Sequence, residues 1–136
     1  MAGAAVKNAV AARLAANWTA TAIVEDNITG QGPADGSSYV TLEYPVARED
    51  QITVGAPGNN VFRESGAFRI KLVSPTGSGL DQALAWIDQL RAIFRGKQFN
   101  NVTTFAPSPG VVDNSNYVAG KFVVSSAVPY QFDRFD

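Results

Sequence analysis

The chain has 136 residues with 11 basic and 12 acidic side chains, a net charge of −1, and neither cysteine nor histidine. The missing cysteines exclude disulfides and thiolate metal sites, and the missing histidines remove the commonest general base and most transition-metal sites. The near-neutral charge argues against a general polyanion binder, and no run approaches the roughly 20 apolar residues of a membrane-spanning helix.

The N-terminal segment, Ala4–Trp18, is rich in alanine, which is a strong helix former. Four apolar side chains recur at every fourth position and predict one narrow buried stripe: Val6, Val10, Leu14 and Trp18. We expect this helix to lie across a sheet or against a second helix.

Short strands and a long loop are predicted next. Thr21–Val24 is a β-branched run typical of a strand, and Asp26–Ser38 holds three glycines and a proline, which indicates a long loop. Tyr39–Tyr44 alternates like a strand, and we expect Pro45 to close it. Gln51–Val54 is a candidate brief strand before a turn.

The centre of the chain predicts a long strand, a tight turn and a long helix. Phe62–Val73 alternates between apolar and polar side chains, as in a strand with one buried face. From Leu80 the apolar period changes to that of a helix, which Ser78 and Asp81 would cap at its start and Gly96 would end. The predicted buried positions of strand and helix are Phe68, Ile70, Leu72, Leu80, Leu84, Ile87, Leu90 and Phe94.

The last third predicts further strands around a second loop. Val102–Phe105 and Tyr117–Val124 are read as strands, and Pro107–Asn116 as the loop between them. The ending Val128–Asp136 either continues the last strand or forms a tail that docks on another subunit. This order predicts an α+β fold, a mostly antiparallel sheet with two main helices packed on one face, in a single domain over residues 1–136.

Candidate chemistry is sparse. Gly77–Gly79 precedes a helix start, where phosphate binds well, but it lacks the lysine and spacing of a P-loop, so a plain helix cap is favoured. The charged side chains of the central strand form either a solvated face or a subunit interface: Arg63, Glu64, Arg69 and Lys71. Glu64 has no sequence partner for a catalytic role. We predict no catalytic residue, no cofactor and no metal site.

Four features in this order resemble tail terminator proteins of long-tailed bacteriophages, of the minor tail protein U type. They are the N-terminal helix, the strand opening FRESG (Phe62–Gly66), the helix ending AIFRG (Ala92–Gly96) and the closing VPYQFD (Val128–Asp133). The resemblance covers nearly the whole chain, and the order and spacing of the motifs carry it.

The resemblance implies a non-enzymatic virion protein of the tail, assembled in the cytoplasm of the bacterial host. It implies a six-membered homo-oligomeric ring that caps the head-proximal end of the tail tube and stops its polymerisation, and it leaves open a monomeric state for the isolated subunit. The implied partners are the major tail tube protein and a head-completion or connector protein, and DNA would pass through the ring without specific binding.

Six side chains are the candidates for a subunit or tube interface: Arg63, Glu64, Arg69, Lys71, Tyr130 and Phe132. The loops Asn27–Ser37 and Ser108–Asn116 would face the tube or the connector. Two alternatives stay open, namely another head-tail connector, head-completion or tube protein of related fold, and a small enzyme or ligand-binding domain. The latter predicts a pocket with convergent polar groups and perturbed carboxylates.

Overall fold

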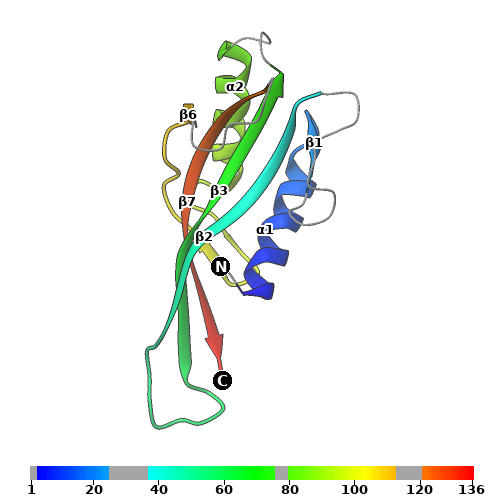
Figure 1. The fold of residues 1–136 in the computed structure, drawn as a ribbon. Helices are drawn as coiled ribbons and strands as arrows, with labels where there is room; N and C mark the ends of the chain where they lie inside the picture. The colour runs from blue at the N-terminus through cyan, green and yellow to red at the C-terminus, as the bar shows by residue number, and fades with distance from the viewer. Residues whose placement is uncertain (1–2, 25–36, 76–79, 113–120) are drawn as a thin grey trace.

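A computed structural model of the chain describes residues 3–24, 37–75, 80–112 and 121–136. Its strands form a seven-stranded sheet in the order β1-β2-β3-β7-β5-β4, with β6 also paired to β7 (Figure 1). Only the β1–β2 pairing of the described strands is parallel, so the predicted α+β class with a mostly antiparallel sheet is confirmed. The elements are α1 (Ala4–Asn17), β1 (Ala22–Ile23), β2 (Tyr39–Gln51), β3 (Val61–Pro75), α2 (Leu80–Phe94), β4 (Gln98–Phe99), β5 (Val102–Thr104), β6 (Val111–Val112) and β7 (Lys121–Phe135).

Strand β3 lies between β2 and β7 at the centre of the sheet, and it has the one buried face that its alternation predicted. Phe68, Ile70 and Leu72 are completely buried, whereas Arg69 and Lys71 belong to the opposite face. Burying each of these apolar side chains contributes about 1.5–3 kcal/mol before the entropy cost. We call the face of Phe68 the inner face and the face of Arg69 the outer face.

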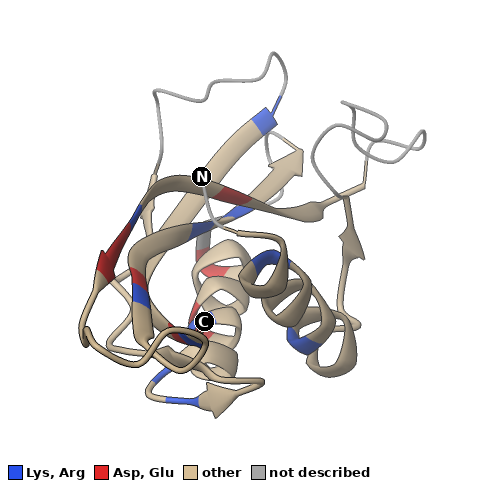
Figure 2. Cartoon of the chain, turned by 90° about the horizontal axis from the view of Figure 1, so that it is seen from below, with Lys and Arg blue, Asp and Glu red and all other residues tan. Residues whose placement is uncertain are grey.

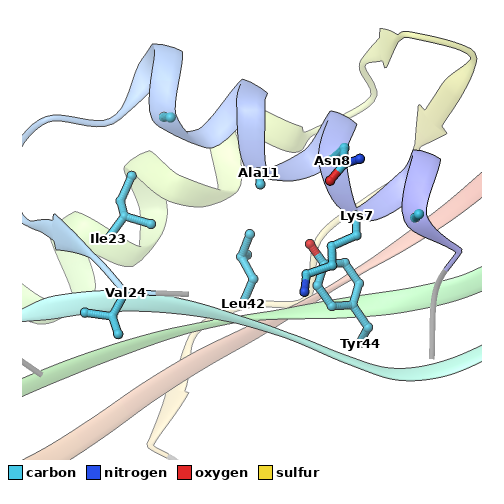
Figure 3. A pocket seen from close by; sticks show the side chains of 9 residues that line it. Lys7, Asn8, Ala11, Ile23, Val24, Leu42 and Tyr44 are labelled. Carbon is cyan, nitrogen blue, oxygen red and sulfur yellow. The ribbon is translucent and has the colours of Figure 1, made fainter. Parts of the chain in front are cut away.

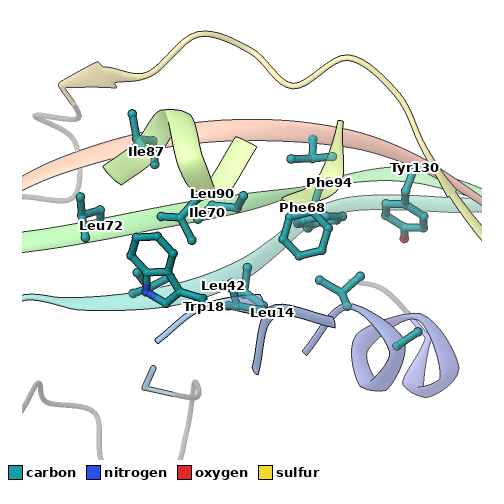
Figure 4. Close-up of a cluster of buried hydrophobic side chains, with 14 of the residues drawn as sticks. Leu14, Trp18, Leu42, Phe68, Ile70, Leu72, Ile87, Leu90, Phe94 and Tyr130 are labelled. Carbon is teal, nitrogen blue, oxygen red and sulfur yellow. The ribbon is translucent and has the colours of Figure 1, made fainter. Parts of the chain in front are cut away.

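Both helices cover the inner face, which confirms that prediction (Figure 4). Trp18, just beyond α1, meets Trp86 of α2 edge-on with ring centroids 6.4 Å apart. Phe68 meets Phe94 in the same manner at 5.0 Å. The helical side chains fully buried in this core are Val6, Val10, Leu14, Ile87, Leu90 and Phe94. Among the described residues, no helix is long and apolar enough to cross a membrane.

The end of α2 is fixed by several contacts. Gly96 has a φ of 57°, the left-handed conformation predicted for the residue that ends this helix. The Thr104 hydroxyl donates to the carbonyl of Phe94, and the Arg13 Nε–H of α1 donates to the carbonyl of Ile93 at 2.8 Å. These bonds satisfy last-turn carbonyls that lack helical partners. The predicted cap at Ser78 lies outside the described residues.

Strand β2 is longer than predicted, because Pro45 does not end it. The strand continues to Gln51, and its register against β3 shifts between Glu43 and Val46. A β-bulge accommodates a proline, which has no N–H to donate to the ladder. Gly66 faces this bulge, and a Cβ on it would lie 2.1 Å from the Val46 carbonyl oxygen. The brief strand predicted at residues 51–54 is wrong beyond Gln51, since residues 52–54 form a loop.

Strand β7 runs unbroken from Lys121 to Phe135, so the C-terminal segment continues the strand and is not a docking tail. The loop predicted at residues 107–116 is partly wrong. Val111–Val112 forms β6 against β7, and the Ser108 backbone N–H donates to the Ala127 carbonyl at 2.8 Å. Residues 113–120, including the predicted strand start at Tyr117, lie outside the described part.

The three long strands continue beyond the start of α1 as a projection without helices (Figure 1). We define this arm as residues 49–63 and 133–136, and its tip as residues 52–60. Gly55 and Gly58 in the tip have φ values of 91° and 89°, which favour glycine and allow the chain to reverse.

Candidate functional site

Glu64 faces away from the other charged side chains of β3. Its position alternates with Arg63, which places it on the inner face, where it is 7% exposed. Its carboxylate accepts a hydrogen bond from the Tyr130 hydroxyl at 2.6 Å and one from the Gly3 backbone N–H at 3.2 Å. Gly3 is the N-cap residue of α1, so the carboxylate lies at the positive end of that helix. This geometry makes Glu64 an anchor that joins α1, β3 and β7 within the subunit.

Tyr130 and Phe132 also act within the subunit. Their side chains are 2% and 8% exposed. The Tyr130 ring lies 6.2 Å from that of Phe68, and the Arg134 guanidinium lies 5.8 Å from the centre of the Phe132 ring. Burial, and then the hydrogen bond to Glu64, raise the pKa of the Tyr130 hydroxyl, so it stays protonated as a donor. These side chains present little surface to a neighbouring molecule.

The remaining predicted interface residues lie on the outer face and form ion pairs there. Figure 2 shows basic and acidic positions along the strands of the sheet. Lys71 Nζ and Arg69 Nη1 both approach the Glu43 carboxylate, at 2.9 and 3.5 Å. Arg63 forms a two-pronged contact with Asp133, with Nε–Oδ1 at 2.8 Å and Nη2–Oδ2 at 3.2 Å. That hydrogen bond lowers the pKa of the Asp133 carboxyl and raises the pKa of Arg63. The sequence therefore grouped residues that the fold divides between two faces.

A groove of about 550 Å³ lies between α1 and the edge of the sheet (Figure 3). Its walls are mostly small or aliphatic, and Lys7 is the charged residue in its lining: Ala4, Lys7, Asn8, Ala11, Ala15, Ile23, Val24, Leu42 and Tyr44. A second hollow of about 190 Å³ near the arm contains Asp133, which Arg63 already engages. Within the described residues, no group of three or more acidic side chains is placed to hold a metal ion.

Sequence reasoning missed the exposed apolar side chains of the arm. Val54 and Ile52 in the tip are 82% and 48% exposed, and Phe135 at the end of β7 is 66% exposed. The available signal was the Gly55 and Gly58 pair, which marks a turn directly after two aliphatic residues. These side chains are candidates for contact with another molecule because ordered apolar groups at a projecting end have no core to join.

The predicted interface loops are only partly described. Of the loop at residues 27–37, only Ser37 is described, and residues 113–116 of the second loop lie outside the described part. Ser108 of that second loop is fastened to β7: its carbonyl accepts from the Ser126 hydroxyl at 2.6 Å, and its own hydroxyl accepts from the Ala127 backbone N–H at 2.9 Å. The predicted phosphate alternative at residues 77–79 also lies outside the described residues.

Comparison with known proteins gives a family and a fold. A family model described as phage tail terminator protein matches residues 5–129. A solved structure that carries no functional description aligns with 100% of this chain and 98% of its own, at a TM-score of 0.61 and 18% sequence identity. At that identity the likeness shows the fold alone. No curated protein matches the sequence significantly.

Proposed function

The chain belongs to the phage tail terminator family and is a structural protein of the virion tail, and we propose that it caps the head-proximal end of the tail tube. In this role it stops tube polymerisation and presents the surface that the head connector joins, and it catalyses no reaction. The observation that carries the proposal is the family match over residues 5–129.

The outer face supports a role in assembly. Arg69 and Lys71 share one carboxylate, Glu43, and the side chains of Arg69 and Glu43 are 34% and 29% exposed. Arg63 and Asp133 are each about one-third exposed, and their contact leaves part of both groups open to a partner. Partly exposed charges at an interface set register and partner choice more than raw affinity. We propose that Arg63, Arg69 and Lys71 meet a neighbouring subunit or the major tail tube protein.

The proposed assembly is a six-membered ring of identical subunits, formed in the bacterial cytoplasm and retained in the virion. Its two sides would contact the major tail tube protein and a head-completion or connector protein. The net charge of −1 suits a channel that DNA passes without being held, because phosphate binding requires clustered basic side chains.

Charge reversal on the outer face tests this function. In cells infected with a phage that lacks this gene, a plasmid-borne Arg69→Glu variant is expected to leave tails of irregular length that do not join heads. The matched control is Arg95→Glu, which reverses an exposed charge just after α2. Circular dichroism of both purified variants checks that the subunit still folds.

Tail lengths and head joining are read by electron microscopy of the lysates. Normal tails with Arg69→Glu would contradict the outer-face assignment. Purified protein that grows open-ended filaments would instead identify a tube protein and contradict capping.

A further inference from the structure

The tip of the arm is an ordered loop that exposes two aliphatic side chains. The Ile52 N–H donates to the Val61 carbonyl at 2.7 Å, and the Val61 N–H donates to the Thr53 hydroxyl at 2.9 Å. The buried Asn60 side-chain oxygen accepts from the Ala56 N–H at 3.1 Å. Ile52 and Val54 are therefore held outward on a fixed backbone, and a partner that binds them has little ordering entropy to overcome.

The α1–β2 groove offers matching surface on the same chain. Its walls include Ala11 and Ala15 from the helix and Leu42 from the sheet, which leave room for aliphatic side chains between them. Figure 3 shows Lys7 beside Tyr44 at one end of the groove. When an apolar side chain fills such a concavity, water leaves the apolar walls of the groove, which favours binding.

The tip cannot reach the groove of its own chain. The Asn60 and Asp136 backbones exchange two hydrogen bonds, at 3.1 and 2.9 Å, so the tip is fastened to the end of β7. Figure 1 shows the arm extending past the start of α1, away from β1, whereas the groove is lined by α1 together with residues 23, 24, 42 and 44. A contact between tip and groove is therefore intermolecular.

Charge favours a second copy of this chain as the occupant. Glu49, three residues before Ile52, is exposed, and so is Lys7 in the groove lining. Neither side chain forms an ion pair within the described residues. An exposed acidic group three positions before Ile52 and an exposed basic group in the groove lining are complementary when two copies meet head to tail.

We propose that Ile52 and Val54 of one copy dock in the α1–β2 groove of the next, with Glu49 of the first copy beside Lys7 of the second. The contact joins two different patches, so an open chain of copies keeps an unused tip at one end and an unused groove at the other until a ring closes. It rests on the features of this chain and does not require the capping role.

Disulfide trapping tests the contact cleanly because the chain has no cysteine of its own. An affinity-tagged Ala11→Cys protein is mixed with untagged Val54→Cys protein, oxidised, and captured by the tag. Covalent heterodimers are expected. The control mixes tagged Gln89→Cys, an exposed position on α2, with Val54→Cys and is expected to give few heterodimers.

The Ala11→Cys/Val54→Cys double variant is also oxidised at high concentration and in tails assembled in cells, where a ladder of covalent multimers is expected. Adducts above the control in either preparation support the proposal, and their absence from both overturns it. Trapping of a cysteine-bearing tube protein by Val54→Cys in place of a second copy also overturns it. Tail length, measured separately, decides the capping role whatever the trapping shows.

Charge exchange tests the proposed ion pair. Lys7→Glu and Glu49→Lys are each expected to reduce trapping about threefold or more, and the double exchange to restore it. Self-association is also compared between Val54→Asp, which is expected to weaken it, and Val111→Asp, which is not. Val111 is 58% exposed on β6, far from the tip in the fold. Equal self-association of these two variants would contradict docking through Val54.

Discussion

The Tyr130 hydroxyl donates to the Glu64 carboxylate at 2.6 Å, which joins β7 to β3 at the point where α1 begins. The same carboxylate accepts the Gly3 N–H, so one buried side chain positions three elements that lie far apart in sequence. Removing either partner leaves a buried charge with fewer hydrogen bonds, which is more costly than losing an exposed ion pair.

Tyr130→Phe is expected to lower the free energy of unfolding by about 1–3 kcal/mol, because Glu64 loses its shortest hydrogen bond without being exposed to water. Urea unfolding followed by circular dichroism measures the change. Tyr39→Phe is the control, since the same substitution in β2 removes no bond to a buried carboxylate, and a similar loss in both variants would contradict the role given to Glu64.

Stability is expected to fall at high pH because of Tyr130. Burial raises the pKa of its hydroxyl above the ordinary value of 10, so the folded state holds this proton more tightly than the unfolded chain. The contribution of this proton to the stability of the folded state is fully present below about pH 10 and is lost as the pH rises through the pKa of Tyr130 in the folded state. The free energy of unfolding, measured from pH 8 to 11, should therefore fall more steeply with pH in the wild type than in Tyr130→Phe. Identical slopes would exclude this linkage.

Because of the Arg63–Asp133 pair, the stability of the fold is also expected to fall at low pH. The hydrogen bond from Arg63 lowers the pKa of Asp133, so its stabilising effect is present above the ordinary carboxyl pKa of about 4 and is lost as the pH falls through the lowered value. In Arg63→Gln the pKa of Asp133, measured by NMR titration, is expected to rise toward the ordinary value. Arg48→Gln is the control, because Arg48 pairs with Asp50 and not with Asp133, and an equal rise of the Asp133 pKa in both variants would contradict this assignment.

Gly66→Ala is expected to lower the free energy of unfolding by about 3 kcal/mol or more. The new Cβ would lie 2.1 Å from the Val46 carbonyl oxygen, so either the bulge or the β2–β3 pairing must shift. The neighbouring Ser65→Ala change is expected to cost far less. Thermal unfolding of both variants gives the comparison, and a Gly66→Ala protein as stable as the wild type would show that the bulge adapts.

Local periodicity was enough to predict the centre of the fold. β3 and α2 were predicted correctly because their apolar side chains repeat with the period of a strand and then of a helix, and each element buries one face. Pro45 misled the prediction because its tolerance depends on Gly66, which pairs beside it from another strand. Such long-range compensation leaves no signal near the proline.

The candidate site was harder to predict for the same reason. The alternation of β3 already put Glu64 in phase with Phe68, and that parity was a usable sign of burial. Its partners Gly3 and Tyr130 lie 61 and 66 positions away, so their convergence depends on the folded sheet. The order of the tip also depends on Asn60 and on its pairing with Asp136, neither of which has a recognisable local pattern.

The pairing of Asp136 with Asn60 affects how the protein should be purified and imaged. A polyhistidine label or fluorescent fusion attached after Asp136 would emerge next to Ile52 and Val54 and would crowd whatever approaches them. A cleavable label, compared before and after its removal, would reveal such interference.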